Sequence, residues 1–398
     1  MTRLQQLLVR LAPLLVIVAV ALIVAACVPG TGSQPSGASP SFSQAPLTPA
    51  KPSGNPVDLL AWLFNPIFQI LFIGLVLLDQ ATYWIWPETG NMVIAIILLT
   101  VILKVATTPI TRRQLVSSRQ TQLLQPEIKD IQRKYKGDRV KANAAVQEFY
   151  KQRGINPASG CLPALLTMGL LIPMYSVFSQ GLTNHDITPM LQVFGFDLAA
   201  ALGIVCDAAP VFDAAGHVLN PCLNPFAFGI NWGLPEPVTT GLVIVGFGIS
   251  ILAIISSLIQ LVASRQMLSP LDPRMADDPN VKVQRQMAYF LPLISIVYGG
   301  ILPAGLFLYW IVSSMFQIGQ QYLVLGYGGL FPLFGWHPEF ARDHTPRYHV
   351  TLPEPKPIEP GTQPDRAAER GKALDRDLSA QSTIRPNRQR SGRRGRRR

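Results

Sequence analysis

Long apolar stretches are the feature that most restricts the fold of this chain of 398 residues. A helix needs about 20 apolar residues to cross the roughly 30 Å hydrocarbon core of a bilayer. After residue 90 the chain contains four such stretches, at 91–111, 161–182, 238–264 and 287–325. Only 14% of the residues are charged, and most charges lie between or after these stretches. The pattern predicts an all-α membrane protein.

The last stretch is about twice the length that one crossing needs. Gly299, Gly300 and Pro303 interrupt it near its middle, and this combination favours a tight turn between two helices. We therefore expect helices at 286–300 and 303–325. With the three stretches before them, the chain is predicted to form five transmembrane helices.

The charges between the helices predict the orientation. The segment 112–160 is strongly basic, whereas 183–237 contains no Lys or Arg and has five acidic residues. Because positive segments stay on the cytoplasmic side, 112–160, the loop 265–285 and everything after 325 are expected to be cytoplasmic. The loop 183–237 then faces outward, as does the N-terminus.

One further apolar stretch, 57–84, does not fit as a sixth crossing helix. A sixth crossing would place the basic segment outside and the acidic loop inside, against the charge pattern. Asn65 and Pro66 also interrupt it, and Trp62 and Trp84 are residues that favour the membrane surface. We predict an outer interfacial helix over 57–84.

The N-terminus has the pattern of a signal peptide. Arg3 and Arg10 precede an apolar run that ends in Val24-Ala25-Ala26-Cys27, a lipobox-like sequence. Segment 1–27 is therefore predicted to be a signal peptide with a lipobox-like end, in which Cys27 is lipidated and becomes the mature N-terminus; the alternative is a signal anchor that stays attached. Residues 28–56 are rich in Ser, Pro and Gly, and they predict a flexible tether.

The cytoplasmic segment 112–160 is predicted to be a hairpin of two amphipathic helices. Apolar residues recur at helical spacing on both sides of Gly137-Asp138, where the pattern breaks. The alternative is a solvated connector, although a few residues would suffice to join two membrane helices.

Polar residues follow one face of three of the predicted membrane helices. Lys104 is the only charged residue in 91–111, and a buried charge in a membrane is expensive and usually functional. Three stripes at one depth predict a hydrophilic groove open to the cytoplasm; the alternative is that Ser and Thr bond their own helices. The stripes are Thr100, Lys104, Thr107 and Thr108; Ser250, Ser257, Gln260 and Ser264; and Trp310, Ser313, Ser314, Gln317 and Gln320.

The cysteines and histidines do not suggest chemistry. Cys206 and Cys222 lie in the outer loop, where a disulfide is permitted, and two free thiols are an equal alternative. The sequence has no Cys/His spacing typical of a metal site, no P-loop and no HExxH motif. We expect no catalytic residue, metal or cofactor, and therefore not an enzyme. An ion-coupled transporter is disfavoured, because the five predicted crossing helices contain no Asp or Glu.

The segment 326–398 is predicted to be a disordered basic tail. It ends in a run of arginines, and such runs bind the phosphates of ribosomal RNA or anionic lipid headgroups equally well. The run contains Arg393, Arg394, Arg396, Arg397 and Arg398.

Several motifs, in order, resemble one family. They are Leu124–Asp138 in the hairpin, Gly154-Ile155-Asn156-Pro157, Gly160-Cys161-Leu162-Pro163, and Pro303–Trp310 with Gln320-Gln321-Tyr322. They resemble the YidC/Oxa1/Alb3 membrane protein insertases over about 57–325, and the lipobox-like start resembles the shorter Gram-positive-type members. The family carries a positive residue, usually Arg, where this chain has Lys104, so the charge is kept but the planar fork is lost.

The resemblance implies an insertase or chaperone of the bacterial inner membrane. Such a protein would move hydrophobic segments of nascent membrane proteins from the cytoplasm into the bilayer through the positively charged groove. It implies ribosomes and the Sec translocon as further partners, besides anionic lipids. Lys104 would hold acidic or polar residues of the incoming segment transiently.

Overall fold

A computed structural model describes the part of the chain that contains the predicted membrane helices. The described residues are 44–51, 56–85, 91–135, 137–155, 162–244, 247–268 and 279–331, and then 336, 338–342, 344, 347–348 and 350. The signal peptide with Cys27, most of the tether, Cys161 and the arginine run lie outside the described residues.

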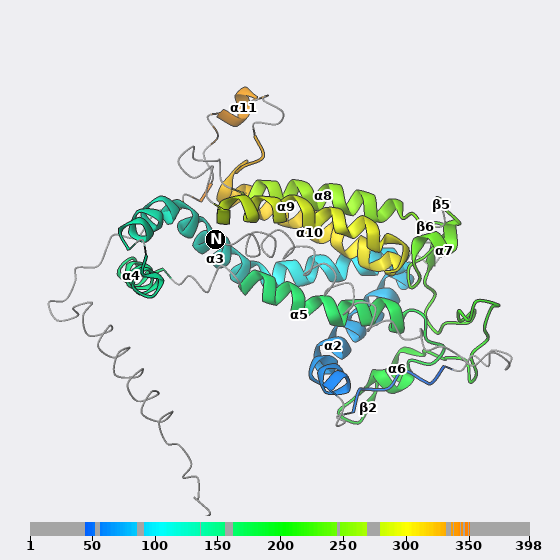
Figure 1. Cartoon of the computed structure of the whole chain (residues 1–398). Coiled ribbons are helices and arrows are strands. Elements are labelled where there is room, and N and C mark those ends of the chain that lie inside the picture. Colours follow the sequence, from blue (N-terminus) through cyan, green and yellow to red (C-terminus); the bar gives the residue numbers. More distant parts are fainter. Residues whose placement is uncertain are drawn as a thin grey trace, which may run out of the picture. The chain divides into compact units, whose positions relative to one another are not determined.

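The described residues are mostly helical (Figure 1). A π-helical turn, Val177–Gly181, extends α5, and 3₁₀ turns lie at Thr188–Leu191 and Tyr298–Gly300. The α-helices are α2 (Pro56–Ile85), α3 (Asn91–Lys134), α4 (Arg139–Gln152), α5 (Leu162–Ser176), α6 (Leu198–Leu202), α7 (Glu236–Thr240), α8 (Ile251–Met267), α9 (Pro279–Val297), α10 (Ala304–Leu325) and α11 (Glu339–Arg342).

The strands are six two-residue segments that form three small antiparallel hairpins. In the sequence, two residues separate the strands of each hairpin, and the second of them is a glycine. The hairpins are β1 (Gln192–Val193) with β2 (Phe196–Asp197), β3 (Phe226–Ala227) with β4 (Ile230–Asn231), and β5 (Val243–Ile244) with β6 (Phe247–Gly248).

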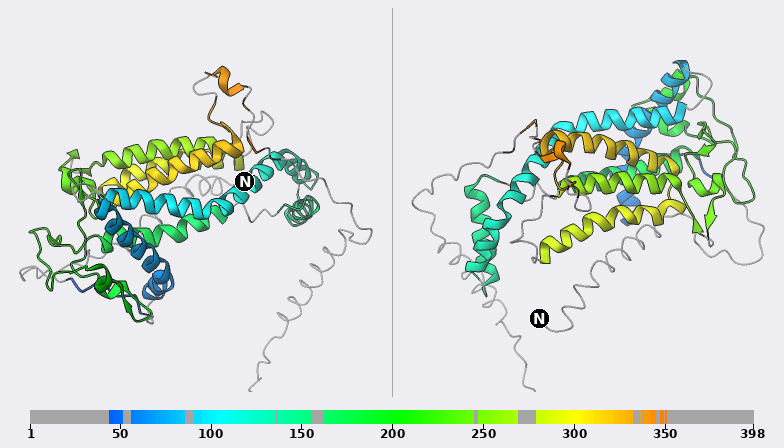
Figure 2. Two further views of the ribbon diagram at one scale, coloured as in Figure 1. Left: turned by 180° about the vertical axis from the view of Figure 1, so that it is seen from behind. Right: turned by 90° about the horizontal axis from the view of Figure 1, so that it is seen from above.

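Four of the long helices form a row. Helix α10 packs between α3 and α8, and α8 packs between α10 and α9, as the right panel of Figure 2 shows. Helix α5 makes its main helix–helix contacts with α2 and α3, on the side of α3 away from α8 (Figure 1). Helix α2 crosses α3 and α5 steeply rather than running beside them (Figures 1 and 2). This layout brings α3, α8 and α10, which carry the three polar stripes, next to one another.

The bundle has two ends, which we name by the segments that they carry. The loop end carries residues 183–250, and the hairpin end carries α4 and the C-terminal part of α3. At the loop end the packing is close: Phe72, Phe178 and Phe307 are fully buried. A Cβ on Gly305 would lie 2.7 Å from Phe178 Cδ1 and 2.9 Å from the Trp232 carbonyl oxygen, so only glycine fits there. The Gly305 N–H donates to that carbonyl.

At the hairpin end, the first arm of the predicted hairpin is continuous with the predicted membrane helix. Helix α3 runs without a break through residue 112, where the sequence analysis placed a boundary. The chain does break at Gly137-Asp138, as predicted. Asp138 caps α4, because its side chain accepts a hydrogen bond from the Lys141 N–H at 3.0 Å. Arg153 then ties α4 to α3 through Glu127, at 3.0 Å.

The predicted helix over 238–264 is wrong in its first half. Helix α8 begins at Ile251, and the residues before it form the end of α7 and the β5–β6 hairpin. Gly241 ends α7 with a φ of 67°, a conformation that favours glycine. Ser250 is therefore the N-cap of α8 rather than a member of a polar stripe. Helix α9, by contrast, begins earlier than predicted, at Pro279, which lies within the predicted loop 265–285.

The segment after α10 was predicted to be disordered from residue 326, and in its described part this is wrong. The Tyr348 N–H donates to the Leu323 carbonyl, and the Arg112 guanidinium lies 4.1 Å from the centre of the Tyr348 ring. Aromatic rings of this segment pack together and against Tyr322 at the end of α10; they are those of Tyr327, Phe331, Trp336, Phe340 and His344.

Among the described residues, two helical segments are long and apolar enough to cross a bilayer by themselves, Trp62–Ile85 and Asn91–Leu123. Helix α8 is apolar but has only 17 residues, which span about 26 Å. Glutamines in α10 and charged residues near the start of α9 lower their hydropathy. The number of five crossing helices, and the placement of α2 at the outer surface, therefore stay predictions.

Candidate functional site

Lys104 lies on α3, 13 residues after the start of the helix at Asn91, and its side chain is half-buried. The ion pairs among the described residues involve Arg133, Lys141, Arg153 and His217, but not Lys104. Its ammonium group is therefore a positive charge that no described carboxylate neutralises.

A polar contact between α3 and α10 fixes the level of Lys104. Gln320 Nε2 donates to Thr108 Oγ1 at 2.7 Å, and Thr111 Oγ1 donates to Gln320 Oε1 at 3.5 Å. Both helices start at the loop end and run in the same direction, since α3 contacts β3 and Ala304 bonds to Leu234. Lys104 lies one turn before Thr108, and therefore about level with Phe316, one turn before Gln320.

The other threonines of the α3 stripe bond their own helix. Thr100 Oγ1 donates to the Ile96 carbonyl at 2.6 Å, and Thr107 Oγ1 donates to the Leu103 carbonyl at 2.8 Å. Thr108 Oγ1 also donates to the carbonyl of Lys104, at 2.7 Å. These hydroxyls agree with the alternative interpretation of the stripe, in which Ser and Thr donate their hydrogen bonds to carbonyls of their own membrane helix.

The stripe on α8 is partly internal to the protein. Ser257 is buried, and its hydroxyl has no hydrogen-bond partner among the described residues. Gln260 Nε2 donates to Ser256 Oγ at 2.7 Å, and Ser264 Oγ donates to the Ala288 carbonyl of α9 at 2.8 Å. Ser256, which the sequence analysis did not select, is fully buried and holds Gln260 in place. Its spacing of four from Gln260 was the available signal.

On α10 the predicted stripe divides by exposure. Ser313 and Ser314 are buried, whereas Gln317 is exposed. Trp310 is half-buried and packs edge-to-face on Phe307, with 5.3 Å between the ring centres. The structure thus brings Thr108 and Gln320 into contact, while Gln260 contacts its own helix through Ser256.

The burial of α3 changes sharply just before Lys104. The preceding two turns contain buried Ala95, Ile96, Leu99 and Thr100, whereas no side chain from Val101 to Arg113 is buried. Lys104 therefore lies just past the closely packed loop end, on a part of α3 that the described protein covers loosely. Burial resumes at Gln114 and Leu115, so the loosely covered part of α3 is a stretch of 13 residues that contains Lys104.

A depression of about 460 Å³ continues along α3 toward the hairpin end. It starts about one turn beyond Lys104, and its mostly apolar lining includes two arginines, residues that favour anionic groups. It is lined by Pro109, Arg112, Arg113, Val116, Ser117 and Gln120.

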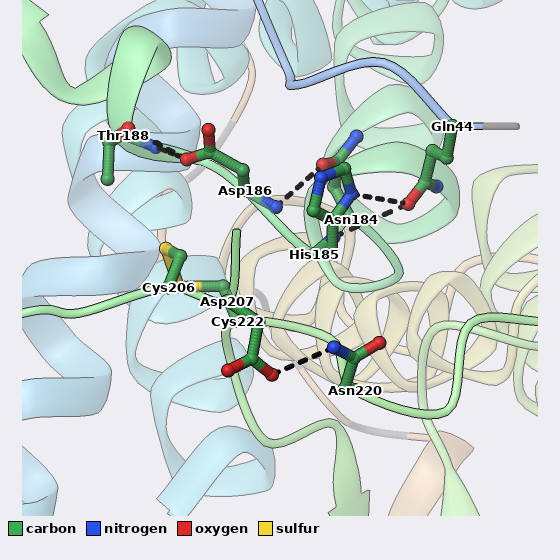
Figure 3. Close-up of a disulfide and its surroundings, with 9 residues drawn as sticks. All are labelled: Gln44, Asn184, His185, Asp186, Thr188, Cys206, Asp207, Asn220 and Cys222. Carbon is green, nitrogen blue, oxygen red and sulfur yellow. Dashed lines mark hydrogen bonds between the residues drawn. A yellow bond between two sulfur atoms is a disulfide. The ribbon is translucent and has the colours of Figure 1, made fainter. Parts of the chain in front are cut away.

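The loop end contains a polar network and a disulfide, which Figure 3 shows. Cys206 and Cys222 are joined by a disulfide, across 16 residues of chain. Close to it, Asn220 donates to the Asp207 carboxylate at 2.8 Å, and the N–H of Cys222 donates to the Asn184 carbonyl. Asn184 Nδ2 also donates to the Ala45 carbonyl, which attaches the described end of the tether to the loop.

Two carboxylates outside the bundle have lowered pKa values. The Lys141 N–H stabilises the charged form of Asp138 and lowers the pKa of that carboxyl. The pKa of Asp213 is lowered chiefly by the N–H of His217, and then by the His217 ring, 3.0 Å away. Both carboxylates accept backbone hydrogen bonds from their own turns, and they read as structural caps. The described residues contain no group of three metal-ligating side chains.

A buried carboxylate that the sequence analysis did not select lies between α7 and α8. Glu236 Oε2 accepts hydrogen bonds from Ser250 Oγ at 2.6 Å and from the Leu252 N–H at 2.9 Å. It thereby accepts hydrogen bonds from donors at the start of α8, and its charge is stabilised by the positive end of the helix dipole. Its role is to position α8.

Comparisons with known proteins agree on one family. The family model described as "60Kd inner membrane protein" matches residues 84–327. The chain is 31% identical to the chloroplast inner membrane protein PPF-1 of Pisum sativum over 60% of its length and 49% of the relative. It is 30% identical to the chloroplast protein ALBINO3 of Arabidopsis thaliana, over 60% of this chain and 47% of the relative.

A bacterial relative extends the match. The membrane protein insertase YidC of Cereibacter sphaeroides is 28% identical over 73% of this chain and 41% of the relative. The chain therefore spans about half the length of the curated relatives that it matches.

Proposed function

We propose that this chain, which belongs to the YidC/Oxa1/Alb3 family of inner membrane proteins, inserts hydrophobic segments of newly made proteins into the membrane. The observation that carries the proposal is the position of Lys104. An unneutralised charge lies just past the closely packed loop end, on a stretch of α3 that the described protein covers loosely.

The orientation that we propose places the loop end outside and the hairpin end in the cytoplasm. The disulfide supports an outer, oxidising location for the loop end. The depression with Arg112 and Arg113 then lies on the cytoplasmic side of Lys104, where an acidic tail of a client enters. The steep crossing of α2 over α3 and α5 supports a position along the outer surface.

In this mechanism the client moves in two stages. Its acidic or polar tail is first attracted by the two arginines and then held by Lys104. A carboxylate 4 Å from an ammonium gains about 4 kcal/mol at an effective dielectric of 20, which offsets part of the cost of leaving water. The apolar segment then moves into lipid beside the loosely covered half of α3. Hydrophobic partition drives this second stage, so no bond is made or broken.

The polar contact between α3 and α10 supports the groove. Hydrogen bonds of Gln320 with Thr108 and Thr111 hold the two helices in register close to Lys104. The part of α3 that carries the positive charge is therefore fixed against α10. Ser257, Ser313, Ser314 and Gln317, on the helices next to α3, would offer polar groups to the client. Thr100 and Thr107 contribute little in this scheme, because their hydroxyls bond their own helix.

The partners that we propose follow from the basic segments. Nascent membrane proteins are the clients, delivered by ribosomes that the hairpin and the terminal arginines contact, alone or beside the Sec translocon. Anionic lipid headgroups would bind the same arginines.

The test replaces Lys104 in purified protein reconstituted into liposomes. We expect Lys104→Gln to slow insertion of a client with an acidic N-terminal tail about tenfold, which corresponds to about 1.4 kcal/mol. Lys104→Arg should keep most of the activity, because it keeps the charge. Protection of the client's tail from added protease measures insertion.

Two controls make the result specific. Lys151→Gln removes an exposed lysine of α4 and should leave insertion unchanged. A client with a neutral tail should be inserted equally by the wild type and by Lys104→Gln. If Lys104→Gln and the wild type insert the acidic client at the same rate, the proposal that Lys104 holds the acidic tail is wrong. Solute uptake without client insertion would instead favour a transporter.

A further inference from the structure

The β1–β2 hairpin exposes a phenylalanine in a backbone conformation that phenylalanine rarely adopts. Phe194 and Gly195 form its turn with φ values of 50° and 83°. Two-residue turns of this kind favour Asn or Asp at the first position, because a large side chain is strained at positive φ. The Phe194 side chain is fully exposed, and its neighbour Phe196 is 61% exposed. Neither strain nor exposure benefits the folded chain itself.

The hairpin is anchored on α2. Gln69 Nε2 donates to the carbonyls of Met190 and Gln192, both at 3.1 Å, and Gln192 is the first residue of β1. Figure 1 shows β2 beside α2, and the left panel of Figure 2 shows the same neighbourhood from behind. The position of the hairpin is therefore set by α2.

Helix α2 itself has two apolar faces. One is buried in the core through Phe68, Leu71, Phe72, Leu75 and Val76. The other is an exposed stripe at helical spacing, with a bulky residue at nearly every turn. It is formed by Leu63, Ile67, Ile70, Leu77 and Trp84. A helix with an exposed face of this kind, in a membrane protein, contacts lipid.

We propose that Phe194 and Phe196 insert into the lipid leaflet at the loop end of the bundle, continuous with the exposed stripe of α2. The lipid contact of the apolar turn residue offsets its backbone strain and holds the hairpin, and through it the loop 183–237, against the bilayer. A lipid occupant fits better than a charged protein surface or nucleic acid, since the described loop 183–237 offers no Lys or Arg.

The β3–β4 hairpin shows the same turn in a different setting. Phe228 and Gly229 have φ values of 54° and 76°, and Phe228 is 77% exposed. Its second strand leads into Trp232, whose carbonyl bonds Gly305. This hairpin is thus tied to α10 rather than to α2, and the proposal does not include it.

The test places a spin label at position 194 of the full chain in lipid nanodiscs. Cys27→Ala and Cys161→Ala remove the other thiols, and the disulfide stays. In the Phe194→Cys variant, the label should be accessible to oxygen and protected from a water-soluble nickel chelate. A label at Ala215→Cys, in an exposed turn of the same loop, is the control and should show the opposite pattern. Equal access of the nickel chelate at the two positions would overturn the proposal.

A second variant separates anchoring from folding. Phe194→Asn suits the positive φ, so the hairpin should keep its turn while it loses the apolar contact. With the label at Phe196→Cys, we expect Phe194→Asn to raise nickel access several-fold. An unchanged label would show that Phe194 does not hold the hairpin in lipid. Cross-linking of Phe194→Cys between copies of the chain would also contradict a lipid contact.

Discussion

At the scale of single residues, the hydrogen bond between Gln320 and Thr108 fixes how α3 and α10 are aligned along their axes. Thr108 and Thr107 both bond their own helix, but only Thr108 also receives a hydrogen bond from Gln320. Neighbouring threonines of one polar face therefore have different roles. The spacing of these residues indicates one shared helix face, but the spacing does not say which hydroxyl has a partner on another helix.

A double-mutant cycle tests this contact. Thr108→Val and Gln320→Leu should each destabilise the protein, and the coupling free energy between them should be about 0.6–1.7 kcal/mol, as for hydrogen bonds between membrane helices. The free energy of unfolding in bicelles, measured by steric trapping, gives the coupling. Thr107→Val is the matched control and should show no coupling to Gln320→Leu. Coupling of equal size for both threonines would contradict the assignment.

Glu236 offers a second test at this scale. Glu236→Ala leaves the Ser250 hydroxyl and the Leu252 N–H without their acceptor, in a place where water is excluded. Hydrogen bonds to a charged group contribute about 1.5–3 kcal/mol, so we expect a loss of stability in that range. Ser250→Ala removes the cap alone and should cost about 1 kcal/mol. If the two variants unfold at the same denaturant concentration, Glu236 does not hold α8.

At the scale of elements, apolar composition predicts which segments are helical better than it predicts where they begin. The helix over 303–325 is found at Ala304–Leu325, because Pro303 and Gly326 mark its ends. The helix over 238–264 begins late, because glycines and the β5–β6 hairpin interrupt an equally apolar sequence. The Glu236 contact across 14 residues, which caps α8, depends on tertiary structure.

The cap of α4 predicts a pH dependence. Because the N–H of Lys141 lowers the pKa of Asp138 in the folded state, Asp138 stabilises α4 above its ordinary pKa of 3.8, and this contribution is lost as the pH falls below it. A spin label at the exposed Gln147 of α4 reports the effect. At pH 7, Asp138→Ala should make the label more mobile than in the wild type.

Between pH 7 and pH 3 the difference between Asp138→Ala and the wild type should become smaller, because protonation of the carboxyl removes the charge that caps α4. Asp130→Ala removes an exposed carboxylate of α3 that pairs with Arg133, and it should leave the label unchanged at either pH. A difference as large at pH 3 as at pH 7 would mean that Asp138 does not act through its charge.

At the scale of the whole molecule, the segment after α10 has two parts with different roles. The described residues of this segment up to Tyr348 fold against the bundle, and Tyr348 lies on Arg112 at the edge of the depression. The composition of 326–398 suggests one disordered tail, because Pro and charge are common throughout. The aromatic residues near its start were the signal for a folded part, since five rings that pack together with Tyr322 of α10 bury a large apolar area.

Truncation after Val350 separates the two parts. It removes the terminal arginines but keeps the contact of Tyr348 with Arg112. We expect binding to ribosomes, measured by co-sedimentation in 50 mM and 200 mM salt, to fall and its dependence on salt to weaken. The melting temperature should stay unchanged. Truncation after Gly326 should lower both. If ribosome binding is unchanged after the first truncation, the terminal arginines do not contact the ribosome and bind either lipid or no partner.

Helix α3 also connects the bundle directly to the hairpin. Its 44 residues span about 66 Å, roughly twice the apolar thickness of a bilayer. It bends on its way from the bundle to the hairpin (Figure 2, right panel), and it contains Pro109 and Pro126, each of which removes a backbone hydrogen bond. In the proposed mechanism, a force on the hairpin, such as that of a docked ribosome, would act along one helix with two weakened points. Pro109 lies five residues from Lys104, so such a force would change the orientation of the Lys104 ammonium group.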